Sequence, residues 1–474
     1  MKSSFRPDDA TALPNAVAGA AMIGVVIAVS GLEYGGPAVL GWLAGGLSLL
    51  AVAICTIGGR FGPRAFVAIG AALTVWAMLS LPDWRDGLAR AIANGSLIVA
   101  MFTALVALRS AAAGSAAIVE CGRFLARQRP GQRYAALTMG GHLFGLTLLY
   151  GAISLLGALA TESARDEPDA EIRRHRTRRM LVAIQRGFAA TLCWSPMAFS
   201  MVIGLSLVEG ARWNAAVLPC AISAVILLAG GWGLDAAFKP RLSRPAPPRA
   251  REPGRWLDHL RPLLVLLGVV MGGAAALHLL TGVEVIGAVI SFIPLVAAGW
   301  IILQTRSQGL GMSQARGRIG QFLFRELPGY RHEVVLLFMA AFIGKIGALI
   351  LVPLMEARGI GLEGMAPLVV VIALIWIIPL TGQIGMNPIL AVSLMVPILP
   401  TPAEMGISPT VMITAITGGW ALSGVSSPFT ASVLLAASLG GVSPRHVGLV
   451  WNGVYVLIMG TVLSLWVTAL AVLL

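Results

Sequence analysis

The segment GVSSPFTAS, residues 424–432, places a proline and several hydroxyl side chains inside a long apolar run. A second segment repeats the pattern, since residues 187–200 read GFAATLCWSPMAFS and residues 419–432 read GWALSGVSSPFTAS, at a constant offset of 232 residues (419 − 187 = 232). The identical positions are Gly187/Gly419, Ala189/Ala421, Ser195/Ser427, Pro196/Pro428 and Ser200/Ser432. Proline lacks an N–H donor and disfavours helical geometry in the residue before it. The repeat therefore predicts two similar helices, each broken at a Ser-Pro pair.

The composition around these segments is that of an integral membrane protein. Hydrophobic residues make up 57% of the 474 residues and charged residues only 12%, whereas soluble domains carry about 25% charged residues. Most apolar spans reach the roughly 20 residues that a helix needs to cross the hydrocarbon layer. The eleven spans lie near residues 14–32, 36–58, 64–81, 91–110, 181–208, 214–236, 260–281, 285–304, 335–353, 409–437 and 447–474.

The net charge of +13 resides mainly in loops between these spans, which argues against a nucleic-acid partner. Lys and Arg concentrate in cytoplasmic loops of membrane proteins. The basic clusters at 60–64, 123–133, 173–179, 239–261 and 306–331 are therefore predicted to be cytoplasmic. This assignment predicts a multi-pass protein of the cytoplasmic (inner) membrane with a cytoplasmic N-terminus.

Two further apolar segments do not fit single crossings. Residues 134–161 have basic clusters on both sides, and residues 366–400 contain Pro379, Gly382, Gly385 and Pro388 near their middle. A re-entrant hairpin, which enters and leaves on the same side, reconciles each segment with the charge pattern. We therefore predict an all-α membrane protein with about eleven transmembrane helices and two re-entrant hairpins.

Alternation of the loops then places the two Ser-Pro helices in opposite directions, which makes the repeat inverted. The predicted organisation is an extra N-terminal helix (1–35), a first repeat (36–236), a basic cytoplasmic linker (237–259) and a second repeat (260–474). A shorter correspondence, FTALVALR at 102–109 and FMAAFIGK at 338–345, pairs Arg109 with Lys345. Each repeat thus carries one cation on the helix that precedes its hairpin.

Broken helices at membrane depth are tolerated where protein or a wet cavity surrounds them, because unpaired backbone groups are costly in lipid. Freed N–H groups at such a break can hold an anion, and freed carbonyls a cation. The alternative is a proline kink in which Ser and Thr bond to their own helix. The predicted substrate-binding residues at the breaks are Ser195, Ser200, Ser426, Ser427, Thr430 and Ser432.

The hairpin tips and one cation complete the predicted site. Gln383 and Asn387 are expected to orient a carboxylate, or instead to bridge helices. Lys345, near the middle of its span, is expected to pair with an anionic substrate or to take the place of a coupling cation. Arg186 is expected to extend to the membrane surface. The predicted Na⁺ ligands are Gly151, Ser154, Gly385 and Asn387, and no other cofactor is expected.

An extra helix followed by two inverted repeats, each with a hairpin and a broken helix, resembles the ion transporter superfamily. This group includes divalent-anion/sodium symporters and the large membrane subunits of tripartite transporters. The segment SSPFTASVLLAASLGGVSP is similar to the broken helix of those large subunits and the residues that follow it. The resemblance implies a homodimer with hairpin tips and broken helices as the site. The symporters' Ser-Asn-Thr signature is absent, since the tips read YGAIS and GMNP, which places sodium coupling in doubt.

The sequence thus predicts a secondary active transporter, and not an enzyme. The favoured substrate is a small organic anion, with carboxylates as the first choice, and transport is coupled to Na⁺ or H⁺. A cation/proton antiporter is the nearest alternative, although such exchangers usually need an intramembrane Asp or Glu. An intramembrane enzyme acting on lipid-linked substrates is a more distant one. The sequence also leaves open a need for a separate binding protein or a small membrane subunit.

Overall fold

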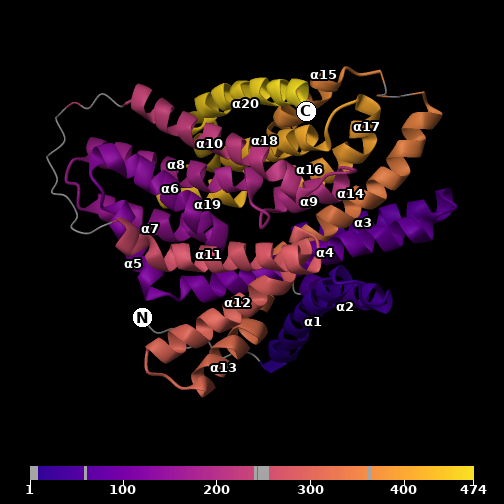
Figure 1. Cartoon of the computed structure of the whole chain (residues 1–474), viewed down its shortest axis with the longest axis horizontal. Helices are drawn as coiled ribbons and strands as arrows, with labels where there is room; N and C mark the ends of the chain where they lie inside the picture. Colours follow the sequence, from indigo (N-terminus) through magenta and orange to yellow (C-terminus); the bar gives the residue numbers. More distant parts are fainter. Residues whose placement is uncertain (1–8, 58–60, 240–242, 244–255, 360–361, 363) are drawn as a thin grey trace. The chain divides into compact units, whose positions relative to one another are not determined.

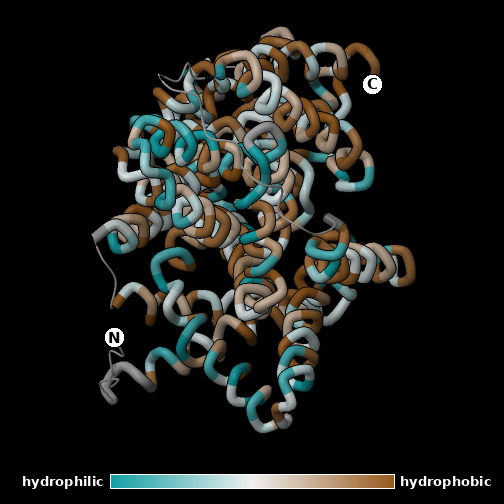
Figure 2. Tube along the Cα trace, turned by 90° about the vertical axis from the view of Figure 1, so that its left-hand side faces the viewer, coloured by the Kyte–Doolittle hydropathy of each residue, from teal (hydrophilic) through white to brown (hydrophobic). Residues whose placement is uncertain are grey.

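The computed structural model describes residues 9–57, 61–239, 243, 256–359, 362 and 364–474, and within them the chain is helical and has no strand (Figure 1). Eleven helical segments in this part are long and apolar enough to span a membrane. Figure 2 shows hydrophobic residues along most of the helices. Each segment overlaps one of the eleven predicted spans, and the prediction of an all-α integral membrane protein is confirmed.

The chain divides into two compact units. Unit 1 takes residues 1–112 and 270–358, and unit 2 takes residues 113–269 and 359–474. Helix α11 (Trp256–Thr281) contributes to both. The other elements of unit 1 are α1 (Asp9–Glu33), α2 (Val39–Ile57), α3 (Phe61–Ser80), α4 (Trp84–Ala113), α12 (Val285–Ser307), α13 (Met312–Gln321), the π-helix η1 (Phe322–Glu326), the 3₁₀-helix η2 (Leu327–Tyr330) and α14 (Arg331–Ala357).

Unit 2 holds both Ser-Pro segments and both segments that we predict as hairpins. Its first part contains α5 (Ala116–Ala126), α6 (Pro130–Leu148), α7 (Gly151–Arg165), α8 (Ala170–Trp194), α9 (Phe199–Leu207) and α10 (Trp213–Ala237). Its second part contains α15 (Pro367–Gln383), α16 (Pro388–Met395), the 3₁₀-helix η3 (Val396–Ile398), α17 (Pro402–Met405), α18 (Pro409–Ser426), α19 (Ala431–Gly440), the π-helix η4 (His446–Trp451) and α20 (Gly453–Leu473).

The boundaries of these units do not follow the predicted repeats, because each unit takes parts of both repeats. The repeat boundaries themselves stay a prediction. The predicted N-terminal helix corresponds to α1, and residues 1–8 before it lie outside the described residues. Most of the predicted linker, residues 240–242 and 244–255, lies outside them too.

Glycines let the helices of unit 2 approach closely at equivalent places in the two repeats. Helix α6 packs along α8, and α15 packs along α18. A Cβ atom added at Gly187 of α8 would lie 2.1 Å from the carbonyl oxygen of Thr138, and one at Gly419 of α18 would lie 2.7 Å from that of Leu374. Both glycines belong to the repeated segment, so the same backbone contact is built twice.

The two broken helices of unit 2 run antiparallel to each other. A Cβ added at Gly440, at the end of α19, would lie 3.3 Å from the side chain of Leu181 near the middle of α8. A Cβ added at Gly424 of α18 would lie 3.2 Å from the side chain of Leu192 in α8. Ile413, near the start of α18, lies 3.2 Å from the Cβ position of Gly204 at the end of α9. An inverted repeat predicts this opposite course.

The second arm of each helix pair packs against the opposite repeat. Helix α7 follows α6 and contacts α19, whereas α16 follows α15 and contacts α9. The connection between α6 and α7 consists of Leu149 and Tyr150, and Leu149 has a positive φ of 51°. Gly385, between α15 and α16, has a φ of 90°, which glycine adopts readily. Each helix pair therefore contacts both broken helices: its first helix packs along the broken helix of its own repeat, and its second helix packs against that of the opposite repeat.

Candidate functional site

The first break lies between α8 and α9 and begins at Ser195. This residue has extended backbone angles, φ −65° and ψ 129°, as expected before proline. Its N–H donates to the carbonyl of Thr191 at 3.1 Å, and its Oγ accepts a hydrogen bond from the N–H of Met197 at 3.2 Å. The N–H of Ala198 then bonds to the Ser195 carbonyl at 3.0 Å, which closes a turn before α9 starts.

The second break, between α18 and α19, repeats this turn bond for bond. Ser427 has φ −70° and ψ 123°, and its N–H donates to the carbonyl of Ser423 at 2.9 Å. The N–H of Phe429 donates to Ser427 Oγ at 3.3 Å, and the N–H of Thr430 donates to the Ser427 carbonyl at 3.2 Å. Every partner is displaced from its counterpart by the same 232 residues, so the sequence repeat is also a structural repeat.

A fourth shared bond holds the two sides of each break together. The buried hydroxyl of Ser200 donates to the carbonyl of Leu192, and that of Ser432 donates to the carbonyl of Gly424. Each bond reaches back eight residues across the interruption and satisfies a carbonyl whose helical partner the break removed. Ser200 and Ser432 therefore stabilise the broken conformation.

We expect Ser200→Ala and Ser432→Ala to lower the free energy of unfolding by similar amounts, about 1–3 kcal/mol each, because each leaves a buried carbonyl without its partner. Unfolding of the purified protein in mixed micelles measures this effect. Ser206→Ala is the matched control, since the half-buried Ser206 hydroxyl bonds only to Ile203 within its own helix, at 3.0 Å. A loss in one half alone would contradict the equivalence of the two bonds.

In each repeat, the end of the first helix of the pair lies close to the broken helix just before the Ser-Pro motif. A Cβ at Gly382, near the end of α15, would lie 2.7 Å from Ser423 Oγ and 3.0 Å from Ser427 Cβ. A Cβ at Gly145, near the end of α6, would lie 3.1 Å from side-chain atoms of Phe188 and of Thr191. The structure therefore brings each turn, with its preceding helix end, against the broken helix of its own repeat.

Only the second break is joined to its neighbouring helix pair through a serine of the Ser-Pro motif. Ser427 Oγ donates to the carbonyl of Gly382 at 2.6 Å. Ser195 Oγ makes no corresponding bond within the described part of the chain. At the first break the bond to the helix pair comes instead from Trp194, the last residue of α8, whose Nε1 donates to His142 Nε2 of α6 at 3.2 Å.

The remaining predicted hydroxyls also bond to the chain itself. Ser426 Oγ donates to the carbonyl of Leu422 at 2.8 Å, and Thr430 Oγ1 donates to that of Ser427 at 2.9 Å while accepting from Ser432 at 3.3 Å. Both hydroxyls thus donate to backbone carbonyls only three or four residues away. Among the described residues, the buried Ser423 Oγ is the hydroxyl near the second break that lacks a partner. In the 232-residue repeat Ser423 corresponds to Thr191, and the sequence gives no sign that its hydroxyl lacks a partner.

The side-chain amides of Gln383, at the end of α15, and Asn387, just before α16, are half-buried and hydrogen-bond to nearby backbone. Gln383 Nε2 donates to the carbonyl of Pro379 at 3.3 Å. Asn387 Oδ1 accepts from the N–H of Ile389 at 2.9 Å and thereby caps α16. The described residues contain no group of three or more His, Cys, Asp or Glu side chains suited to a metal.

The predicted Na⁺ ligands lie at the two helix-pair turns. Gly151 and Ser154 belong to the first turn of α7, and the N–H of Ser154 bonds to the Tyr150 carbonyl at 3.3 Å. Gly385 and Asn387 lie in the connection between α15 and α16. Because Asn387 Oδ1 already accepts a backbone N–H, a cation would share that oxygen with the helix cap. The sodium assignment stays a prediction.

Lys345 belongs to unit 1, whereas every other predicted site residue belongs to unit 2. It lies inside α14 and is half-buried. It has no hydrogen-bond or ion-pair partner within the described residues. Arg109, its predicted counterpart, lies over the ring of Tyr330, with Cζ 5.6 Å from the ring centroid. An ionised lysine without a protein partner in a membrane helix is costly, which is typical of a functional residue.

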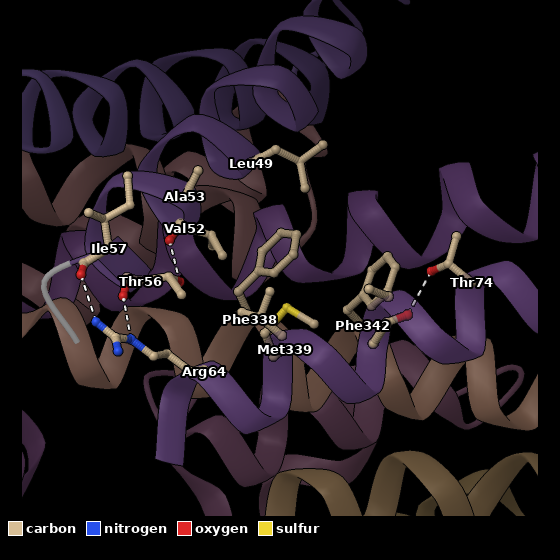
Figure 3. Close-up of a pocket in the computed structure, with 13 residues that line it drawn as sticks. Leu49, Val52, Ala53, Thr56, Ile57, Arg64, Thr74, Phe338, Met339 and Phe342 are labelled. Atoms are coloured by element: carbon tan, nitrogen blue, oxygen red, sulfur yellow. Dashed lines mark hydrogen bonds between the residues drawn. The ribbon is translucent and has the colours of Figure 1, made fainter. Parts of the chain in front are cut away.

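A cavity of about 490 Å³ lies in unit 1 between α2, α3 and α14 (Figure 3). Figure 3 shows Arg64 directed at the end of α2, where it donates to the carbonyls of Thr56 and Ile57 at 3.5 and 2.9 Å. The hydroxyls of Thr56 and Thr74 bond to carbonyls of their own helices. The other lining residues are apolar or glycine, so this cavity is a weaker candidate for an anionic solute than the breaks of unit 2.

Comparison with known proteins finds a shared fold without close relatives. No family model matches the chain, and no curated protein matches its sequence. The YdaH transporter of Alcanivorax borkumensis is similar in structure, with a TM-score of 0.53, 15% sequence identity, and coverage of 86% of this chain and 98% of YdaH.

MtrF of Neisseria gonorrhoeae, described with a class of antimetabolite efflux pumps, has the same TM-score and identity over 88% of this chain and 97% of MtrF. At this identity the likeness shows the fold alone. The predicted membership of the ion transporter superfamily stays a prediction. The chain folds like two membrane proteins described as a transporter and an efflux pump.

Proposed function

We propose that this protein is a secondary active transporter that moves a small organic anion, a carboxylate in the first place, across the cytoplasmic membrane, coupled to Na⁺ or H⁺. The observation that carries the proposal is the pair of antiparallel broken helices in unit 2, whose interruptions at Ser195 and Ser427 are built by the same bonds. Transporters with inverted repeats bind solutes at such interruptions. The fold shared with a transporter and an efflux pump supports the same class and offers no parallel for an enzyme.

An anionic solute suits the groups that the breaks present. Helices α9 and α19 both start at a break, and the first N–H groups of a helix have no partner within it. Together with the helix dipole, these groups favour a negative charge. At the second break, the unpartnered Ser423 hydroxyl adds a donor from the adjoining helix turn. The solute would therefore bind mainly through backbone N–H groups, and the serines of the motif would hold the backbone in place.

The membrane arrangement belongs to the same proposal. Helix pairs α6/α7 and α15/α16 are the re-entrant hairpins, the first open to the cytoplasm and the second to the outside. The N-terminus is cytoplasmic, and two copies of the chain form a homodimer in the inner membrane. A separate binding protein or small membrane subunit is a further candidate partner.

Outward transport is a second candidate direction, because MtrF is described with a class of efflux pumps. A cation/proton antiporter remains the alternative chemistry. Both share the fold and the breaks with the proposed symporter, and they differ in which species crosses the membrane and in which gradient drives it.

Reconstituted liposomes test the proposal. Purified protein should accumulate labelled carboxylates such as succinate or benzoate when a Na⁺ or pH gradient is imposed, and a reversed gradient should drive the same solute outward. Protein-free liposomes give the background. Cation exchange without movement of any organic anion would establish the antiporter instead, and consumption of a lipid-linked substrate without a gradient would indicate an enzyme.

Lys345 provides a separate test of the anion assignment. We expect Lys345→Gln to lower the initial uptake rate at least tenfold and Lys345→Arg to retain part of it, because the arginine keeps the positive charge. Arg358→Gln, at an exposed cation just after α14, should leave uptake unchanged. Normal uptake by Lys345→Gln would remove this residue from the mechanism.

A further inference from the structure

A second cavity, of about 350 Å³, lies in unit 2 and takes no part in the breaks. Helices α8, α10 and α20 and the π-helix η4 line it, and α10 packs against both α8 and α20 (Figure 1). Its polar lining residues are His175, Arg178, Arg179, Arg186, Asp235 and Tyr455. Three arginines thus face a single carboxylate within one cavity.

Arg186 supplies a buried positive charge to this cavity. Its side chain donates to Asn452 Oδ1 at 3.0 Å, to the Tyr134 hydroxyl at 3.2 Å and to the Trp451 carbonyl at 3.3 Å. Its Cζ lies 4.1 Å from the centroid of the Tyr455 ring. All of these partners are neutral, and among the described residues no carboxylate pairs with Arg186. The structure therefore contradicts the expectation that Arg186 extends to the membrane surface.

The neutral partners hold this guanidinium in one orientation. Asn452 is fully buried, and its Nδ2 donates to Gln185 Oε1 at 3.0 Å and to the carbonyl of Val447 at 3.1 Å. Tyr455 is fixed in turn through its hydroxyl, which donates to the carbonyl of Leu227 at 3.1 Å. A buried charge without a counter-ion is strongly unfavourable. A rigid cation in an open cavity therefore favours an anion from outside the chain.

The single carboxylate of the cavity, that of Asp235, is paired with Arg179 and does not neutralise Arg186. Arg179 and Asp235 form a bidentate pair, with Nε–Oδ1 and Nη2–Oδ2 distances of 2.9 and 2.6 Å, and so neutralise each other. Arg178 is exposed, and neither it nor His175 has a hydrogen-bond or ion-pair partner within the described residues. Arg178 and Arg186 thus remain for an added anion.

The rim of the cavity is apolar and open. The side chains of Phe238, Val450 and Val454 line it and are 69%, 58% and 57% exposed. The basic cluster at 173–179, which belongs to α8, is predicted to be cytoplasmic, and the cytoplasmic leaflet is rich in anionic lipids. Basic cavities between membrane helices on this side are suited to phospholipid headgroups.

We propose that this cavity binds a phosphate group between Arg178 and Arg186, and that an acidic phospholipid supplies it while its acyl chains lie on Phe238, Val450 and Val454. Guanidinium groups bind phosphate oxygens through charge-assisted hydrogen bonds. The apolar rim favours a lipid over a soluble phosphate ester, because a soluble ester gains nothing from exposed apolar side chains.

Native mass spectrometry of the purified protein in detergent, titrated with phosphatidylglycerol, cardiolipin or phosphatidylcholine, tests the proposal. The acidic lipids should bind at least tenfold more tightly than phosphatidylcholine. Arg178→Gln should remove most of this preference, whereas Arg174→Gln, at an exposed arginine of the same helix outside the cavity, should preserve it. Equal binding of acidic and zwitterionic lipids, or equal effects of the two substitutions, would overturn the proposal.

Two further arms identify the source of the phosphate and protect the test against misfolding. Inorganic phosphate or glycerol 3-phosphate at millimolar concentration should not displace phosphatidylglycerol; displacement would keep the phosphate site and assign it to a soluble ligand. Arg186→Gln should abolish the lipid preference if the variant folds. If it does not fold, Arg178→Gln still decides the outcome, since an exposed side chain is replaced.

Discussion

Replacing Ser427 with alanine should reduce solute uptake about tenfold while the protein stays folded. The substitution removes the hydrogen bond from Ser427 Oγ to the Gly382 carbonyl, 2.6 Å long, which joins the second break to the end of α15. The Gly382 carbonyl keeps a second donor, the N–H of Gly385 at 3.3 Å, so the substitution removes one hydrogen bond, which contributes about 0.5–1.5 kcal/mol. A tenfold change in rate corresponds to about 1.4 kcal/mol, which lies within this range.

Two companion variants make this measurement specific. Ser195→Ala should have a smaller effect, because the structure describes no bond from Ser195 to a neighbouring helix pair. Thr461→Ala should have none, because the Thr461 hydroxyl is exposed and bonds only to Leu457 in its own helix, at 3.0 Å. Uptake and circular dichroism of the same preparations separate transport from folding. Undiminished uptake by Ser427→Ala would eliminate this hydroxyl from the site.

A second large effect is expected at Gly187. Alanine there would place its Cβ 2.1 Å from the Thr138 carbonyl oxygen, a backbone atom that moves only if α6 and α8 separate. Overpacking of this kind costs about 1–3 kcal/mol and more where backbone must shift. We expect Gly187→Ala to lower the free energy of unfolding by at least about 2 kcal/mol and to reduce the yield of folded protein.

The matched control for this variant is Gly233→Ala in α10. The Cβ of an alanine at that position meets no atom within 4 Å, so the only change is the helix propensity, which favours alanine by up to about 1 kcal/mol. Unfolding measured for both variants in the same detergent gives the comparison. Equal stability of the two proteins would show that α6 and α8 do not approach each other as closely as the structure places them.

The fold was largely predictable from sequence because the dominant signals are local. Runs of about 20 apolar residues fix the spans, and proline fixes the backbone around Ser195 and Ser427 wherever those residues lie in the fold. The repeat at an offset of 232 residues then indicated that the breaks are equivalent. The structure confirms both broken helices and shows that their hydrogen bonds repeat as well.

The roles of individual side chains were less predictable, because they depend on partners far along the chain. Nothing near Ser427 indicates that its hydroxyl bonds to Gly382, 45 residues away. Arg186, at the start of its predicted span, is expected to extend to the membrane surface, but its partner Asn452 lies 266 residues further on, and the hydrogen bond between them keeps Arg186 in the interior. Apolar periodicity shows that a helix face is covered without showing which residues cover it.

The bond between Ser427 and Gly382, which has no counterpart at Ser195, bears on the resting state of the proposed transporter. In a protein whose two halves exchange conformations, identical halves would make the inward-open and outward-open forms equal in free energy. A hydrogen bond present at only one break removes that degeneracy, and a difference of about 1 kcal/mol corresponds to a population ratio of roughly five to one. In the proposed transporter, a single hydroxyl would therefore contribute measurably to which side of the membrane the empty protein faces.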